Sequence, residues 1–479
     1  MATVARQVTQ QPSQWSELPV DLVLMIGERL SLYADYVRFR SVCGSWYSAL
    51  PKTLRPHHQH DDQYFPFLLL PACEDDDDND DDSSSCSVGL LSIAENSKIY
   101  HLRGLPIKEF RTMHYVGSSH GWVVTVDEAT PSMYLIDPFS RTQLSLPPIS
   151  TFRQQCWYGK IYKECSIRGV CKLGESSCVQ KVVLSSNPSS LSYSSSSSSS
   201  SLYVAAIAIC GMYSVLAFSR PEDKAWSSFL ADNDNGERYT EVLFYKDILH
   251  VVTRTHYSHY IERYHIDVDI GGRVVPKDVE RIRLPKGYNI RWKSYLVESR
   301  GNLLMVAREV KKIALSNPIL GPYGKRFFEE KTIGFRVFKL CPPGINNGTD
   351  DEGGYDGDEY HDDERRKKSS KWVQIKNLGD IVLFLGVNSS MSLSCHDFPP
   401  GYAISRGNCI YFTHHNQVKG RYHVNLGWGY DIDAFGDMGV FYLKDGSIEP
   451  ILPLQGCPSI RHPLRRFFPP QPIWLSTPT

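Results

Sequence analysis

The first 55 residues carry the hydrophobic spacing of short helices. Apolar residues recur every four positions and so share one side of a helix: Leu22, Ile26 and Leu30. Pro19 precedes this stripe, where a first helical turn tolerates a missing N–H donor. A second helix is predicted after the cap residue Asp35 and a third around Trp46. We expect a three-helix unit over residues 14–55, too small to be stable without a partner or the domain that follows.

From residue 88 onward the pattern changes to a period of two and begins to repeat. Each of six loosely similar units has a strand, a turn with Gly or Asp, a second strand, and a segment ending in Leu-Pro or Trp. One unit reads GWVVTVDE, MYLIDP and then LSLPPI. Antiparallel units of about 40 to 60 residues are typical of a β-propeller. We therefore predict a small all-α unit followed by a large all-β domain over residues 88–479, propeller-like with kelch-like repeats. A pair of β-sandwiches or a barrel remains as the alternative.

Three segments have compositions that cannot bury enough apolar surface to order themselves. Residues 56–87 are predicted to be a linker, with the acidic run EDDDDNDDDSSS at Glu74–Ser85. Inserts are predicted near residues 185–201, which contain a serine run, and 343–370, which are acidic and end near RRKK. Strand-like sequence resumes after each insert, so both are expected to loop out of the β-domain.

The stretch Leu202–Phe218 has no charged residue and reaches the lower length limit of a membrane-spanning helix. Gly211 divides it into two runs rich in Val, Ile, Tyr and Phe. Such runs favour two buried strands joined by a turn. We expect no membrane association.

Composition and charge exclude several classes of protein. The 52 Lys and Arg residues balance 53 Asp and Glu among 479 residues, which disfavours a dedicated nucleic-acid or anionic-membrane surface. The 12 cysteines are scattered, with no C-x-x-C pair, and the N-terminus lacks the apolar core of a signal peptide. Reduced thiols and a location in the nucleus, the cytoplasm or both are the expectation.

No pattern of residues supports catalysis or a bound metal. Ser119 lies in a G-x-S-x-G pattern, but strand sequence follows it, whereas a nucleophile elbow requires a helix. His57, His58 and His60 have no matching pair at structural-zinc spacing. The adjacent triplet Cys395–Asp397 cannot fold back into a triad, and the motif GPYGK lacks the spacing of a P-loop. We predict a protein that is not an enzyme and has no cofactor.

Two motifs bracket the helical unit and carry a specific resemblance. The run WSELPVDL begins at Trp15, and the run RSVC-x-x-W ends at Trp46. With this Leu-Pro start and Val-Cys-x-x-Trp end, the segment from Ser16 to Leu54 closely resembles an F-box. Two positions depart from the pattern. Gly44 stands where F-boxes usually carry a basic residue, and Gly27 interrupts the first helix at a cost of about 1 kcal/mol relative to Ala.

Motifs along the β-domain extend the resemblance to most of the chain from Leu90 to Thr479. They are GSSHGW at Gly117–Trp122, LIDPF at Leu135–Phe139, Trp372 with LGDIVLFLG at Leu378–Gly386, CIYFT at Cys409–Thr413, and PIW at Pro472–Trp474. The chain is similar to plant F-box proteins of the SKIP-like type, which share a C-terminal domain of unknown function numbered 295.

The resemblance implies the substrate-recognition subunit of a Skp–cullin–F-box ubiquitin ligase, a receptor without catalytic groups. It would bind a Skp-type adaptor, and through it cullin and RING subunits, and would present an unknown target protein for ubiquitination and proteasomal degradation. The residues expected to bury apolar surface against the adaptor are Leu18, Pro19, Leu22, Ile26, Leu30, Val42 and Trp46. Part of this set must also form the unit's own core. The alternative is a protein-interaction scaffold outside any ligase, with a vestigial F-box.

Overall fold

The computed structural model describes most of the chain between residues 14 and 475. Its larger gaps are residues 51–65, 74–86, 103–112, 153–178, 189–202, 230–237, 315–327, 343–369, 414–436 and 452–472. Shorter gaps of up to five residues occur elsewhere, and residues 1–13 and 476–479 also lie outside the described part. The acidic run, the serine run and most of the predicted insert at 343–370 therefore fall outside the described residues.

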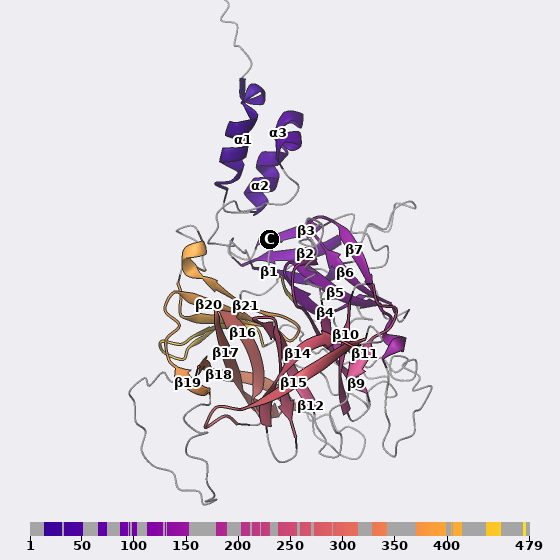
Figure 1. The fold of residues 1–479 in the computed structure, drawn as a ribbon. Coiled ribbons are helices and arrows are strands. Elements are labelled where there is room, and N and C mark those ends of the chain that lie inside the picture. Colours follow the sequence, from indigo (N-terminus) through magenta and orange to yellow (C-terminus); the bar gives the residue numbers. More distant parts are fainter. Residues whose placement is uncertain are drawn as a thin grey trace, which may run out of the picture.

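The N-terminal unit consists of one short 3-10 helix and three α-helices. They are η1 (Gln14–Glu17), α1 (Val20–Gly27), α2 (Tyr33–Arg40) and α3 (Gly44–Ala49). Their shared core holds four buried side chains, from Val23, Tyr36, Trp46 and Leu50. So small a core stabilises little by itself. In Figure 1 the helices stand apart from the β-domain, above β3.

The rest of the described chain folds into six sheets, or blades, of which the first five are antiparallel throughout. Blade 1 has β25 (Ile473–Leu475), β1 (Phe67–Cys73), β2 (Ser87–Ser92) and β3 (Lys98–Leu102); blade 2 has β4 (Met113–Ser119), β5 (Trp122–Asp127), β6 (Met133–Asp137) and β7 (Thr142–Leu146), followed by η3 (Ile149–Thr151). Blade 3 has β8 (Val179–Leu184), β9 (Val204–Cys210), β10 (Tyr213–Ser219) and β11 (Ser227–Phe229); blade 4 has β12 (Arg238–Tyr245), β13 (Ile248–Arg254), β14 (His259–Val268) and β15 (Val274–Arg283). Blade 5 has β16 (Lys293–Ser299), β17 (Asn302–Ala314), β18 (Phe328–Cys341) and β19 (Lys371–Ile375). Blade 6 has β20 (Ile381–Leu385), β21 (Ser390–Ser394), η7 (Cys395–Asp397), β22 (Cys409–Phe412), β23 (Gly439–Tyr442) and β24 (Ile448–Pro450).

One edge strand of each blade packs against the next blade, so the six sheets form a ring. Contacts run from β25 to β4, and then through β8, β12 and β16 to β21. Hydrophobic clusters fill the spaces between neighbouring blades, as between blades 2 and 3 and between blades 5 and 6. The protein is therefore a six-bladed β-propeller, which excludes the sandwich pair and the barrel.

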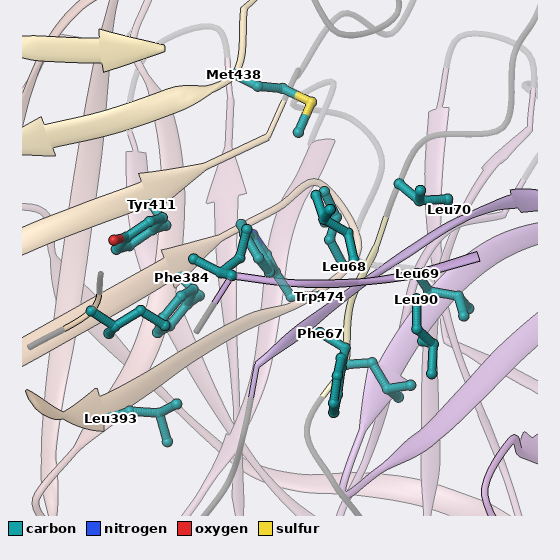
Figure 2. Packing of buried hydrophobic residues seen from close by; sticks show 14 of the residues in the cluster. Phe67, Leu68, Leu69, Leu70, Leu90, Phe384, Leu393, Tyr411, Met438 and Trp474 are labelled. Carbon is teal, nitrogen blue, oxygen red and sulfur yellow. The ribbon is translucent and has the colours of Figure 1, made fainter. Parts of the chain in front are cut away.

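The last strand of the chain closes the ring. β25 pairs antiparallel with β1, so residues from both ends of the domain share blade 1. The fully buried Trp474 lies against Phe384 of blade 6 (Figure 2). Their ring centroids are 5.1 Å apart. The Ser389 hydroxyl also donates a hydrogen bond to the Trp474 carbonyl over 2.9 Å. Blades 1 and 6 are thus joined by both strand pairing and side-chain packing.

Three details differ from the sequence analysis or extend it. β1 and the first residue of β2 lie inside residues 56–87, which were predicted to be a linker. β1 was missed because its short apolar run stands between two polar segments. Blade 6 has five strands, with β22 parallel to β20, so it departs from a simple meander. The stretch Leu202–Phe218 supplies the buried pair β9 and β10. No helix in the described part of the chain is both long and apolar enough to cross a bilayer.

Candidate functional site: the apolar surface of the helical unit

The first α-helix places apolar side chains on two opposite sides. Pro19 is its N-cap residue, with φ −54° and ψ 140°. Proline has no backbone N–H, and this costs nothing at the start of a helix, where the N–H groups have no partner within the helix. Val23 and Gly27 point into the core of the unit. Leu22, which is 41% exposed, and Met25 lie three residues apart on the solvent side. Helix α1 therefore holds the unit together with one side and presents an apolar stripe with the other.

The seven residues expected to bind an adaptor fall into two groups. Trp46 is only 7% exposed, and its indole Nε1 donates a hydrogen bond to the Trp15 carbonyl over 3.1 Å. Leu18 and Leu30 are partly buried and pack against the same core. Pro19, Leu22 and Val42 are exposed, and Ile26 is half-buried. The first group supports the surface from within, and the second group forms part of it.

Several exposed apolar side chains were absent from the sequence-based set. They are Trp15, Val20, Met25, Val37 and Tyr47. Met25 could have been found, because it lies one turn from Leu22 on the same helix. Tyr47 could not, because its exposure depends on how α3 packs. The Arg40 guanidinium lies 3.9 Å from the Tyr47 ring centroid and donates from Nε to the Leu50 carbonyl over 3.1 Å, so Arg40 links α2 to α3.

The two glycine departures have different structural settings. A Cβ on Gly27 would lie 2.6 Å from Cδ2 of Leu50, closer than unstrained atoms approach. Gly27 therefore lets α1 pack closely against Leu50, whose side chain would have to shift to admit a larger residue. The sequence alone indicated only the cost of Gly27 to the helix. A Cβ on Gly44 would meet nothing within 4 Å. Gly44 therefore stands at an open position, where a Cβ atom meets no neighbour.

The candidate catalytic motifs form other structures. Ser119 ends β4, and the turn that follows has φ 51° at His120 and 80° at Gly121, which is the geometry of a tight hairpin. A Cβ on Gly117 of the same motif would lie 2.2 Å from the Val182 carbonyl oxygen, so this glycine allows β4 to approach β8. Asp397 caps η7 by accepting from the Ser394 amide over 2.8 Å.

Metal chemistry has no support in the described residues, which contain no group of three or more His, Cys, Asp and Glu side chains able to hold an ion. His57, His58, His60 and the GPYGK motif lie outside the described part of the chain. The predicted lack of a cofactor stays a prediction.

Comparison with known proteins identifies the domain. Residues 90–442 match the KIB1-4 beta-propeller family. The chain belongs to this family. The KIB1-4 propeller thus covers almost all the described blades, and the helical unit precedes it.

Relatives of this chain, two of them similar over nearly its whole length, carry an F-box name. F-box protein SKIP23 of Arabidopsis thaliana is 24% identical over 97% of this chain and 96% of its own length. F-box protein At2g17036 of the same plant is 24% identical over 97% of this chain and 95% of its own length. Putative F-box protein At4g22170 is 33% identical over 29% of this chain and 34% of its own length. The resemblance to plant F-box proteins is confirmed.

Proposed function

We propose that this protein is the substrate-recognition subunit of a Skp–cullin–F-box ubiquitin ligase in the nucleus or the cytoplasm. The helical unit binds a Skp-type adaptor, which connects it to the cullin and RING subunits. The propeller binds a target protein and presents it for ubiquitination and degradation. The observation that carries this proposal is the exposed apolar stripe of α1. The relatives that match nearly the whole chain are named F-box proteins, which supports it.

The chemistry of the stripe suits a protein partner. Burying one exposed Leu or Met side chain completely stabilises a complex by roughly 1.5 to 3 kcal/mol. Leu22 and Met25 lie side by side, with Pro19 and Val42 also exposed. Apolar side chains fixed on helices lose little freedom on binding, and a few such anchors dominate the affinity of most interfaces.

The propeller suits the receptor role because its ring is closed and its cores are well buried. A fixed scaffold holds a bound target at one distance from the ubiquitin-loaded enzyme and so raises the effective concentration of the target's lysines. This mechanism needs no catalytic group in the chain itself. It needs only that adaptor binding and target binding occur together.

The proposal is tested by affinity purification from cells treated with a proteasome inhibitor. The intact protein is compared with Leu22→Glu and with the control Val373→Glu, whose side chain in β19 is exposed to a similar extent, 38%. We expect the intact protein and the control to retain adaptor and cullin, and Leu22→Glu to lose both while it still retains its target. Full function of a chain lacking residues 1–54 would instead support a scaffold with a vestigial F-box.

A further inference from the structure

A row of basic side chains crosses one end of blade 4. Arg238 of β12 is the direct cross-strand partner of Arg254 in β13, and Arg254 is in turn the partner of His259 in β14. Direct partners in an antiparallel ladder point to the same side of the sheet, with Cβ atoms about 4.5 to 5.5 Å apart. Arg238 is exposed, and Arg254 and His259 are half-buried. The three side chains therefore form one continuous basic row.

The basic row lies on the side of blade 4 that faces blade 5. Val252 precedes Arg254 by two residues on the same side of β13, and it packs in the hydrophobic cluster between blades 4 and 5. Tyr288, in the loop from β15 to β16, packs against the same cluster. Burial raises the pKa of Tyr288, and the charge of Arg254 opposes this rise, so the two side chains lie close together.

The positive charge of the row is not neutralised by the described residues. Neither guanidinium forms an ion pair or a hydrogen bond with a residue that the structure describes. Glu241 lies one pair further inward on the same side, but it is only 3% exposed and is paired with Lys181 of blade 3. The loop of residues 284–292 contains Lys286 and Arg291 and no acidic residue. Like charges directly opposite each other destabilise a sheet, so folding alone does not account for the row.

The charge and the donors of the row match one phosphate group. Burial and the neighbouring Arg254 lower the pKa of His259 below its ordinary value of 6.5, so the imidazole is neutral at pH 7 and has one N–H to donate. The row then carries the two charges of Arg238 and Arg254. A phosphate monoester carries about −1.5 to −2 at pH 7 and has three acceptor oxygens, whereas a carboxylate carries a single charge. One guanidinium binds two phosphate oxygens at once.

The surroundings of the row favour a single phosphate group over a polyanion. Binding of nucleic acid requires a cationic surface that contacts several phosphates. The adjacent end of blade 5, where β16 begins at Lys293, instead carries Glu309 and Glu330. The whole chain has a net charge of −1. A strand of nucleic acid laid across this end would meet these carboxylates, whereas one phosphorylated side chain reaches the row alone.

We propose that Arg238, Arg254 and His259 bind the phosphate group of a phosphorylated side chain on a partner protein. The two guanidinium groups hold the phosphate oxygens, and the imidazole donates a further hydrogen bond. The binding itself does not depend on the proposed ligase function. Only the statement that the phosphorylated protein is the ligase's target rests on that function.

The test is fluorescence anisotropy with the full-length chain and a labelled peptide that carries one phosphoserine among Gly and Ala residues. We expect this peptide to bind at least about tenfold more tightly than the same peptide with unmodified serine. Arg238→Gln and Arg254→Gln should each weaken its binding by about threefold or more. Arg254→Lys, which keeps the charge but loses the forked geometry, should weaken it less than Arg254→Gln.

The control is Arg273→Gln, because Arg273 is exposed at the opposite end of blade 4 and its loss removes the same charge. It should leave phosphopeptide binding unchanged. The thermal unfolding midpoint of each variant is measured as well. Since Arg238 is exposed, Arg238→Gln tests the row even where the half-buried Arg254 is needed for folding.

Four results would overturn the proposal. They are equal affinity for the two peptides, an equal loss for Arg273→Gln, inorganic phosphate that binds as tightly as the phosphopeptide, and tighter Arg254-dependent binding of a single-stranded oligonucleotide or a phosphoinositide vesicle.

The acidic stretch before Arg238, which lies outside the described residues, supplies one more test. Phosphopeptide binding that appears only in Asp232→Asn/Asp234→Asn/Glu237→Gln would assign the row to the chain's own carboxylates and would also overturn the proposal. Adaptor binding by Arg238→Gln is measured in parallel and should be unchanged. Loss of phosphopeptide binding with normal adaptor binding refers to the row alone, so failure of one proposal is distinguishable from failure of the other.

Discussion

The indole Nε1 of Trp474 donates a hydrogen bond over 3.0 Å to the carbonyl of Leu385, which joins the C-terminal strand to blade 6. The two residues are far apart in the sequence, and Trp474 is fully buried between blades 1 and 6. The propeller can close only when this last strand has been placed. Its stability should therefore depend strongly on one side chain close to the end of the chain.

Replacement of Trp474 by Ala should destabilise the propeller by about 3 to 5 kcal/mol, because the change leaves a large cavity at the closure. Thermal unfolding followed by tryptophan fluorescence measures the loss. Trp372→Ala is the control, since Trp372 lies on the outer strand β19, is only partly buried and donates to the Arg283 carbonyl over 3.0 Å. Equal losses for the two variants would contradict the importance given to ring closure.

A buried ion pair joins blades 3 and 4 between Lys181 of β8 and Glu241 of β12. Burial raises the pKa of the Glu241 carboxyl, and the adjacent Lys181 ammonium opposes this shift. Lys181→Met alone should cost about 3 to 5 kcal/mol, because it leaves a buried carboxyl without its partner. The double variant Lys181→Met/Glu241→Leu should recover much of this loss in denaturant unfolding. A double variant that unfolds more easily than Lys181→Met would contradict this expectation, because it would show that apolar side chains cannot replace the ion pair between the two blades.

His250 of β13 makes stability depend on pH. Burial lowers the pKa of its imidazole to about 4, and Nδ1 lies 3.0 Å from the Ile248 carbonyl. Since the pKa in the folded protein lies below the ordinary value near 6.5, stability is complete above pH 6.5 and falls as the pH drops from 6.5 towards 4. The loss reaches roughly 3 kcal/mol at the acidic end.

The variant His250→Asn should have a shallower fall in its unfolding midpoint over this pH range. His265→Asn serves as the control, because His265 is exposed on β14. An unchanged pH profile for His250→Asn would mean that other groups account for the acid sensitivity.

The two glycines of the helical unit should respond in opposite ways to Ala. Gly44→Ala should stabilise α3 by a few tenths of a kcal/mol, less than the roughly 1 kcal/mol of a helix interior, because Gly44 is the first residue of α3 and the site is open. Gly27→Ala should destabilise the unit despite the same gain in propensity, because its Cβ would meet Leu50. Hydrogen exchange of the α1 and α3 amides measures both changes, and greater protection in Gly27→Ala would contradict the packing described here.

The sequence predicted the repeat and the helical unit because both are local patterns. Runs of β-branched and aromatic residues, as in Trp122–Asp127, indicate β structure without knowledge of the partner strands. The ring order, the parallel strand β22 and the fit of Gly117 against Val182 could not be predicted, because they depend on contacts between distant residues. Which members of the predicted adaptor-binding set form the core, Trp46 among them, could not be predicted for the same reason, since a motif does not reveal which side of α3 faces the core.

The adaptor affinity of the purified chain tests the central claim most directly. The dissociation constant for a Skp-type adaptor should be at least about tenfold higher for Leu22→Glu than for the unchanged protein. It should remain the same for Val373→Glu, whose exposed side chain lies on the propeller. An unchanged protein that does not bind the adaptor, or Leu22→Glu and Val373→Glu variants with equal affinities, would contradict the account.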